Sequence, residues 1–288
     1  MRNLYRLLPF LLAVIFSTEL SYGAYPLVRN FGRTAYGGGT QNWCIDQDSL
    51  GRIWVANRDG LLMYDGNIWR KAYLDNYGAL RGVRVDTRNN RVWACGSNTF
   101  GYFEPDARQG RFVRYVSLTG MLPEGTEVGE VWRIHNSSDR IFFVADFRIY
   151  EYDGNHLRVY SSADKITASA YYKGHIYICS SGLGLCRLDG GQIVDIDTGD
   201  ADMAHAAMMG VYDNSRLVIL TSFDGAYEFD GHTLKPFLER YRDYMVSGQG
   251  FSLAMRNRLL AIGTVRNGGL IVDMENPDAA PSFLNQLS

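Results

Sequence analysis

Short polar segments follow a series of apolar runs along the chain, and they contain residue types that bind polar ligands. In the first, Asn57, Arg58 and Asp59 come directly after the apolar run 53–56. Amides, guanidinium groups and carboxylates form hydrogen bonds with hydroxyl and acidic groups. Sugars and acidic small molecules are therefore the ligands that such segments suit. The candidate ligand-binding residues are Asn42, Asn57, Arg58, Asp59, Asn98, Glu130, Asp146, Arg148, Asp224, Arg266 and Asn267.

The same polar segments have a purely structural interpretation, because short polar turns occur on any soluble all-β protein of this size. Trp43 and Trp132 come close to these segments in the sequence. An indole ring can stack on a sugar, but we expect these two rings to belong to the core. The sequence leaves the choice between a ligand site and ordinary turns open.

Catalysis and metal binding are less well supported. Asp59, Glu130, Asp146 and Asp224 could supply an acid/base pair for glycosidic cleavage, but that chemistry needs a defined separation that a sequence cannot give. The stretch 46–51 resembles the start of a calcium loop, yet Leu50 stands where a ligand is needed, so these carboxylates are expected to cap a turn. We assign no catalytic residue, no metal and no cofactor.

The apolar runs recur with a regular spacing, which predicts the fold. Steps of 39, 49, 35, 41 and 42 residues separate the centres of the runs, which are Trp54, Trp93, Phe142, Tyr177, Val218 and Leu260. A period near 40 with several strands per unit is typical of β-propeller blades. Runs such as 141–144 are apolar at successive positions, which indicates strands covered on both faces. A β-sandwich would instead leave one face of each sheet in water.

Each unit is predicted to hold four antiparallel strands, named A to D. In the first blade they are 43–46, 53–56, 61–64 and 68–73. Asp65-Gly66 forms the turn between C and D, since Asp-Gly accepts the positive φ of a tight hairpin. The turn recurs at Asp153-Gly154, Asp189-Gly190 and Asp230-Gly231.

The fold class is therefore all-β, a propeller with six recognisable four-stranded blades. The segment 25–31 resembles an outer strand, and no strands A to C accompany it, so we expect an incomplete seven-bladed ring. The alternative is a six-bladed ring in which this segment pairs elsewhere. An open ring exposes sheet faces, so low stability and a homodimer are expected.

The first 23 residues read as an export signal, with Arg2 and Arg6, an apolar stretch and small residues before Gly23. The domains are thus a signal peptide, 1–23, and a propeller, 24–288. No later segment is apolar enough to span a membrane. The sequence predicts an exported protein, periplasmic or secreted.

Charge and cysteines add two expectations. Lys plus Arg is 29 and Asp plus Glu is 31, a balance that does not favour nucleic-acid binding. Cys179 and Cys186 flank a tight turn and would face each other if Gly182-Leu183 were that turn. They form a disulfide in that case, and otherwise the four cysteines are buried thiols.

Four strings of this sequence are distinctive: the stretch 39–48, the pattern I-x-x-D-x-x-G-x-I-W-V-A-x-x-x-G-L over 45–61, and the strings 100–106 and 130–134. They resemble the exported sensor region of the two-component regulator propeller proteins of Bacteroidetes, and the resemblance covers most of the mature chain. In such proteins more propeller, a three-Tyr domain, a membrane helix and a kinase or DNA-binding output follow, and none of these occurs in this sequence.

The resemblance implies a sensing module, often for glycans or their breakdown products, without an output domain. The leading hypothesis is an exported ligand-sensing propeller that takes an oligosaccharide and is not an enzyme. The alternatives are an exported propeller lyase or hydrolase acting on glycans, and a protein-interaction scaffold.

Overall fold

The computed structural model describes residues 29–74, 78–106, 111–212, 215–277 and 279–284. The chain divides into a first unit, 1–32, and a second unit, 33–288. The predicted signal peptide and residues 24–28 lie outside the described residues, and 29–32 form no strand. The predicted outer strand at 25–31 is therefore not observed in its described part.

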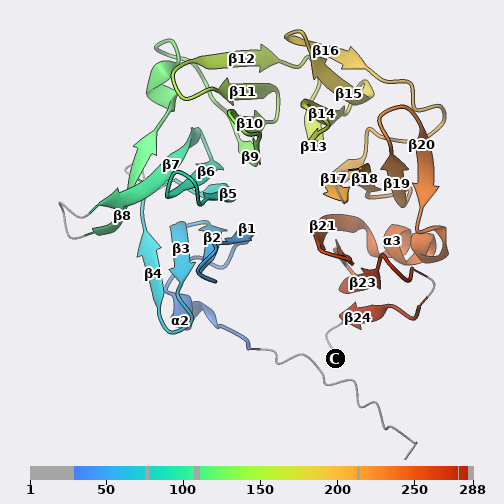
Figure 1. The fold of residues 1–288 in the computed structure, drawn as a ribbon, viewed down its shortest axis with the longest axis horizontal. Coiled ribbons are helices and arrows are strands. Elements are labelled where there is room, and N and C mark those ends of the chain that lie inside the picture. Colours follow the sequence, from blue (N-terminus) through green and yellow to red (C-terminus); the bar gives the residue numbers. More distant parts are fainter. Residues whose placement is uncertain (1–28, 75–77, 107–110, 213–214, 278, 285–288) are drawn as a thin grey trace, which may run out of the picture. The chain divides into compact units, whose positions relative to one another are not determined.

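The second unit contains six four-stranded antiparallel sheets, and each is a simple meander from an inner to an outer strand. The inner strands of successive blades contact one another, from β1 and β5 to β17 and β21, and the blades follow one another about a common axis (Figure 1). The predicted all-β propeller with six blades is confirmed.

The first three blades comprise β1 (Asn42–Gln47), β2 (Ile53–Asn57), β3 (Gly60–Tyr64) and β4 (Trp69–Ala72); β5 (Leu80–Asp86), β6 (Arg91–Gly96), β7 (Thr99–Asp106) and β8 (Arg111–Ser117); and β9 (Val131–Asn136), β10 (Ile141–Ala145), β11 (Arg148–Tyr152) and β12 (Leu157–Ser161).

The other three blades follow the same plan, with β24 as the outer strand of the sixth. They comprise β13 (Ile166–Tyr172), β14 (His175–Ser180), β15 (Gly184–Asp189) and β16 (Gln192–Asp195); β17 (Ala206–Tyr212), β18 (Arg216–Thr221), β19 (Ala226–Phe229) and β20 (Leu234–Phe237); and β21 (Gly250–Arg256), β22 (Leu259–Thr264), β23 (Gly269–Asp273) and β24 (Ser282–Leu284). Short helices lie in the connections: α2 (Arg33–Tyr36), η1 (Thr119–Met121), η2 (Glu239–Tyr241) and α3 (Arg242–Gly248).

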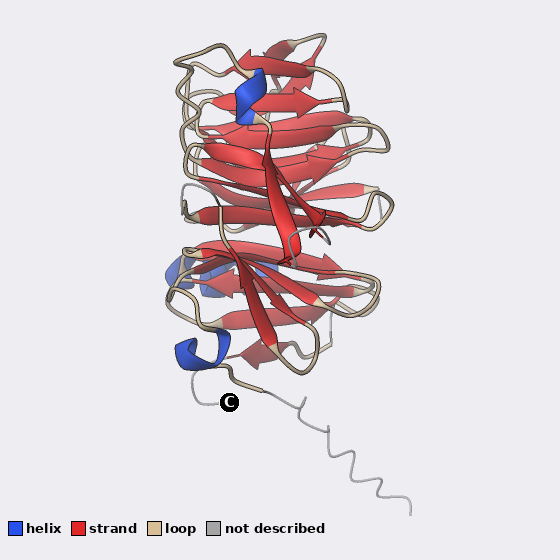
Figure 2. Cartoon of the chain, turned by 90° about the vertical axis from the view of Figure 1, so that its left-hand side faces the viewer, coloured by secondary structure: helices blue, strands red, loops and turns tan. Residues whose placement is uncertain are grey.

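The hydrophobic core lies between blades, as the continuous apolar runs predict. In β10, Phe143 and its alternate neighbours pack in a cluster with Trp93 and Phe100 of the second blade. Phe142 and Val144, one residue away, pack in another cluster with the fourth blade. All five residues of β10 are buried because its successive side chains enter two different interfaces. Figure 2 shows the sheets stacked in this way, with loops at both edges.

Three of the Asp-Gly turns share one hydrogen-bond pattern. The Asp65 carboxylate accepts the N–H groups of Asn67 and Ile68, at 3.0 and 2.9 Å, and Gly66 has a φ of 96°. Asp153 and Asp230 accept the corresponding two N–H groups in their turns. These backbone hydrogen bonds hold the pKa values of the three carboxyl groups below the ordinary value.

The carboxylate in the first A–B turn has a structural role, as expected. Asp48 accepts hydrogen bonds from Arg52 Nε at 2.6 Å and Trp54 Nε1 at 2.9 Å, besides two backbone N–H groups. Asp86 repeats the arrangement by accepting from Trp93 Nε1 at 3.2 Å. The Asp and Trp of the sequence repeat are therefore hydrogen-bonded partners.

The disulfide alternative for Cys179 and Cys186 is wrong. Residues 181–183 form a three-residue turn, because Ser180 pairs with Gly184, and Cys179 therefore pairs with Leu185. The offset of one residue places the two sulfur atoms on opposite faces of the sheet. Cys179 packs with the fifth blade and Cys186 with the third. All four cysteines are free thiols, and burial raises the pKa of Cys95 and Cys179.

The first and sixth blades meet through a single described hydrogen bond, from Arg256 Nη1 in β21 to Gln47 Oε1 in β1 at 3.0 Å. On the faces turned away from their other neighbours, Ile45 is 67% exposed and Leu259 is 46% exposed. The outer strand of the sixth blade is β24, which completes its four strands. A missing seventh blade stays a prediction.

Candidate functional site

One edge of the propeller collects the B–C turns and the D–A connections, and we call it the BC rim. A hydrogen bond repeats there in every blade, because the residue after strand B donates its N–H to the carbonyl of the residue before strand A. The donor and acceptor pairs are Arg58 and Gln41, Ser97 and Ala79, Asp146 and Glu130, Ser181 and Lys165, Ser222 and His205, and Val265 and Gln249, at 2.8 to 3.2 Å. The repeat places the B–C turns and the D–A connections on the same rim.

A β-bulge also repeats, at the second residue of every inner strand. The register between strands A and B shifts between Asn42 and Cys44 in the first blade and at the equivalent point in the other five. A bulge leaves its extra residue unpaired and changes the direction of that side chain. The six bulged residues are Trp43, Arg81, Trp132, Thr167, Ala207 and Phe251.

Three bulged residues from consecutive blades contact one another, and we call them the WRW cluster: Trp43, Arg81 and Trp132. The indole rings of Trp43 and Trp132 meet edge to face with centroids 5.6 Å apart. The Arg81 guanidinium lies 4.7 Å from the centroid of Trp43 and 5.3 Å from that of Trp132. Guanidinium groups are attracted to aromatic faces at these distances.

The expectation that both rings are core residues is wrong for Trp43, which is 38% exposed. Trp132 is half-buried, and its Nε1 donates to Asp146 at 2.9 Å. The bulge explains why neither ring is fully buried between blades. It takes both residues out of the alternation that directs strand side chains into the interfaces between blades.

Carboxylates border the WRW cluster. Glu130, whose side chain is 35% exposed, accepts from Arg81 Nε at 3.0 Å and from Ser97 Oγ at 2.5 Å. Asp146 lies 3.3 Å from Lys165 Nζ. The cluster thus combines an exposed indole, a guanidinium group and carboxylate acceptors, which together can bind a polar molecule with an apolar face.

The BC rim also exposes large apolar side chains. Phe147, Phe223 and Val265 stand in B–C turns and are 48%, 54% and 57% exposed. Leu183, in the same type of turn, is 51% exposed, and the bulged Phe251 is 56% exposed. Exposed apolar groups that gather on one edge are a feature of binding surfaces.

Several predicted site residues are engaged within the loops. Asn57 is fully buried, and its amide bonds Gly39 N, Gly39 O, Gln41 O, Asn42 Oδ1 and Asp59 N. Asn98, at a φ of 52°, accepts from Gly129 N at 2.9 Å. Arg148 donates to Glu127 O at 2.9 Å, and Asn267 bonds Tyr244 O and Ser247 Oγ. These hydrogen bonds hold the loops in place, so the four side chains have a structural role.

Asp224 belongs to an ion-paired cluster at the fifth blade. It accepts from Arg242 Nη2 at 2.6 Å and from the hydroxyl of Tyr227. Partial burial opposes ionisation, but the hydrogen bonds from Tyr227 and Arg242 hold the pKa of Asp224 below its ordinary value. Burial and the same carboxylate raise the pKa of Tyr227 to about 12. Asp224 is thus a fixed anion, a poor general acid.

The remaining predicted residues lie at the surface of the BC rim. Asn42, Arg58 and Arg266 are exposed, and Asp59 is half-buried. The structure brings Glu130 and Asp146 to the WRW cluster, while Asp224, Arg266 and Asn267 belong to the fifth and sixth blades. Sequence reasoning missed Arg81 and Lys165. Aligning each inner strand on Trp43 would have placed Arg81 at the equivalent position of the second blade.

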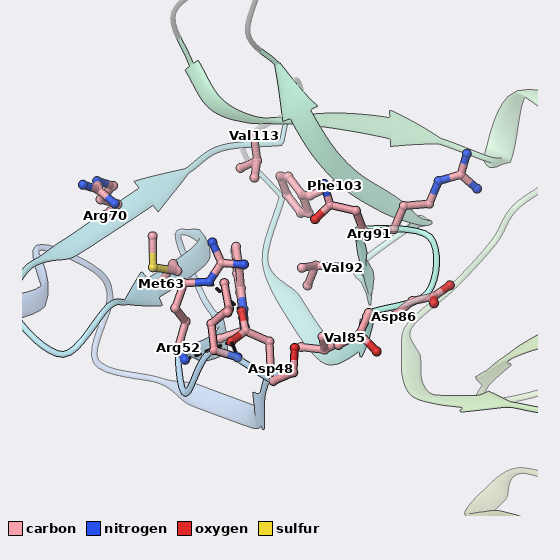
Figure 3. A pocket seen from close by; sticks show the side chains of 15 residues that line it. Asp48, Arg52, Met63, Arg70, Val85, Asp86, Arg91, Val92, Phe103 and Val113 are labelled. Atoms are coloured by element: carbon pink, nitrogen blue, oxygen red, sulfur yellow. Dashed lines mark hydrogen bonds and ion pairs between the residues drawn. The ribbon is translucent and has the colours of Figure 1, made fainter.

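A separate cavity of about 290 Å³ lies on the opposite rim, between the first and second blades. Figure 3 shows Arg70 of β4 and Arg91 of β6 on either side of it, with Asp48 beside Arg52. Arg70 pairs with Asp65 at 3.2 Å, and Arg91 lies 4.2 Å from the centroid of the Tyr102 ring. The charged groups here are therefore partnered within the blades.

No group of three or more His, Cys, Asp or Glu side chains that could hold a metal ion occurs in the described ranges. No helix in the described part of the chain is long and apolar enough to cross a membrane.

The fold and its rim define a six-bladed β-propeller whose BC rim carries an aromatic and charged cluster. No protein-family model and no curated protein sequence matches this chain. Among solved structures it is similar to the extracellular domain of BT4673 of Bacteroides thetaiotaomicron, described as a one-component system, with 19% identity over 86% of this chain and 34% of that chain, and a TM-score of 0.65.

The extracellular domain of BT3049 from the same organism, described as a hybrid two-component system, is 17% identical over 90% of this chain and 36% of that chain, with a TM-score of 0.68. Virginiamycin B lyase from Staphylococcus aureus is 11% identical over 86% of both chains, with a TM-score of 0.67. The chain spans about a third of the length of the two sensor ectodomains. The resemblance found in the sequence is thus confirmed at the level of the fold, which also occurs in an enzyme.

Proposed function

We propose that this chain is a ligand-binding propeller of the sensor type, which takes a glycan or a glycan fragment on the BC rim and does not transform it. The observation that carries the proposal is the WRW cluster, where three bulged residues from separate blades place an exposed indole beside a guanidinium group and carboxylates. The similarity to extracellular domains of regulatory systems supports a sensing role and an exported, periplasmic or secreted, location.

The test is a thermal-shift and calorimetric screen of the protein against neutral and acidic oligosaccharides, with product analysis of each sample. A sensing module is expected to be stabilised by at least one saccharide and to release no product. Trp43→Ala should weaken that binding about tenfold or more, because burial of a large apolar side chain against a ligand is worth about 1.5–3 kcal/mol. Phe283→Ala is the matched control, since Phe283 is 46% exposed in an outer strand.

An exported lyase or hydrolase acting on glycans is the second candidate function. The observation that favours it is that virginiamycin B lyase, an enzyme, has a similar fold. Product formation that is lost in Asp146→Ala, together with unchanged folding, would support the enzyme and contradict the sensing proposal. Failure of every saccharide to bind would support an interaction scaffold, for which the exposed apolar residues of the BC rim offer a surface.

A further inference from the structure

Two arginines of neighbouring inner strands have buried N–H groups that find no hydrogen-bond partner among the described residues. They are Nη1 of Arg81 in β5 and Nε of Arg133 in β9. The hydrogen bond that Arg133 does make is long, 3.4 Å from Nη1 to the carbonyl of Trp132. Desolvated guanidinium groups without an acceptor are costly, so such groups call for an anion.

The local charge balance points the same way. In the inner strands of the first three blades, Arg84 lies 3.9 Å from Asp46 and Arg81 lies 3.0 Å from Glu130. No described carboxylate forms an ion pair with Arg133. Desolvation lowers the pKa of Arg133, and the thiols of Cys44 and Cys95 lie near it. Burial raises the pKa of Cys95, so that thiol stays neutral and cannot balance the guanidinium charge.

The strands that carry the two arginines, β5 and β9, approach closely. A Cβ atom on Gly82 would stand 2.7 Å from Cys95 Sγ and 3.2 Å from the carbonyl oxygen of Trp132. Glycine at this position therefore lets β5 pack against the backbone of Trp132 in β9. Arg81 contacts the ring of Trp132, and Arg133 contacts its carbonyl. Trp132 thus contacts both arginines, and its ring also meets the exposed indole of Trp43.

We propose that the WRW cluster binds an anionic sugar, with Arg81 and Arg133 holding an oxyanion on that sugar and the exposed ring of Trp43 contacting the pyranose face. The inference rests on the proposed function and names its ligand class. Guanidinium groups bind carboxylate and sulfate oxygens through paired N–H donors, which fits the unpartnered N–H groups here. Glu130 adds an acceptor for a sugar hydroxyl.

The experiment measures binding by calorimetry to four probes: a uronic acid oligosaccharide, a sulfated oligosaccharide, the neutral parent oligosaccharide, and free acetate or sulfate. At least one charged oligosaccharide is expected to bind at least tenfold more tightly than the neutral parent and the free anions. Arg81→Gln should remove that preference, and Arg81→Lys should restore it only in part because lysine lacks the planar fork. Arg88→Gln, an exposed arginine on the opposite rim, should change nothing.

The outcomes separate the two proposals. Equal binding of neutral and charged saccharides, or an unchanged preference in Arg81→Gln, overturns the anionic-sugar site and leaves a glycan-binding propeller in place. If free acetate or sulfate binds as tightly as the charged oligosaccharides, the site recognises the anion alone, and the proposal that it binds an anionic sugar is overturned. Absence of binding by every saccharide overturns both proposals. Far-ultraviolet circular dichroism of each variant shows that it is folded, so that a loss of binding reports on the site.

Discussion

Desolvated ionisable groups on the inner strands show how single residues depend on their surroundings. His135 in β9 bonds Ser169 Oγ of β13 at 2.8 Å. Desolvation, assisted by the positive charges of Arg84 and Arg133, lowers the pKa of His135 to about 3. The folded protein therefore keeps this imidazole neutral at pH values where an unfolded chain would protonate it.

A pH dependence of stability follows from His135. Its pKa is lower in the folded state than the ordinary 6.5, so the unfolded chain binds more protons as the pH falls. The free energy of unfolding should decrease below about pH 6.5 with a slope of up to about 1.4 kcal/mol per pH unit. Urea unfolding measured between pH 7.5 and about pH 4.5 checks this result.

The control is His135→Gln, which keeps a hydrogen-bonding group toward Ser169 and cannot titrate. This variant should show a nearly flat stability between pH 7.5 and about pH 5, above the range in which Asp carboxyl groups titrate. A wild-type profile that is equally flat would contradict the desolvated, neutral histidine. His156, which is exposed beside Asp153, offers a second control, since His156→Gln should keep the wild-type slope.

At the scale of the element, the B strand of each blade is the unit that the interfaces share. Phe143 in β10 is fully buried, with ring centroids 4.9 Å from Phe100 and 6.0 Å from Trp93. These partners belong to the second blade, so the strand joins two sheets through side-chain packing alone.

Phe143→Ala should therefore lower the free energy of unfolding by about 3–5 kcal/mol, because it leaves a cavity between two blades. Val159→Ala, at a 41% exposed position of β12, should cost less than about 1 kcal/mol. Chemical denaturation of both variants measures the difference. Equal effects of the two substitutions would be inconsistent with a core that lies between blades.

The sequence predicted the elements well where local chemistry decides them. The four strands of the first blade lie within one residue of their predicted bounds, because apolar runs and Asp-Gly turns act over a few residues. The Cys179–Cys186 register was not predictable in the same way. A three-residue turn in place of a two-residue turn reverses which face each thiol occupies.

At the scale of the whole molecule, the first and sixth blades are the exception to the packing rule. The face of the first blade turned away from the second blade exposes Ile45, and the face of the sixth blade turned away from the fifth exposes Leu259. The second to fifth blades bury the equivalent faces between neighbours. The homodimer expected from the sequence stays a prediction, and these residues are where a second copy of the chain would gain apolar contact.

Sedimentation velocity over a range of protein concentrations tests that expectation. A weight-average mass that rises toward twice the monomer mass with concentration is expected, because apolar faces associate more as their concentration increases. Ile45→Lys should shift the midpoint of this rise about tenfold or more to higher concentration, while Leu50→Lys, in an exposed A–B turn, should not. A monomer at every concentration would refute self-association.

The amino-acid sequence alone determined the blades, since strand period, both-faced apolar runs and turn residues are local properties of the chain. It could not determine the candidate site. Trp43, Arg81 and Trp132 are 38 and 51 residues apart in sequence, and each looks like an ordinary strand residue. Only the closing of three blades about one axis, with a bulge that redirects each side chain, brings an indole, a guanidinium group and a second indole into contact.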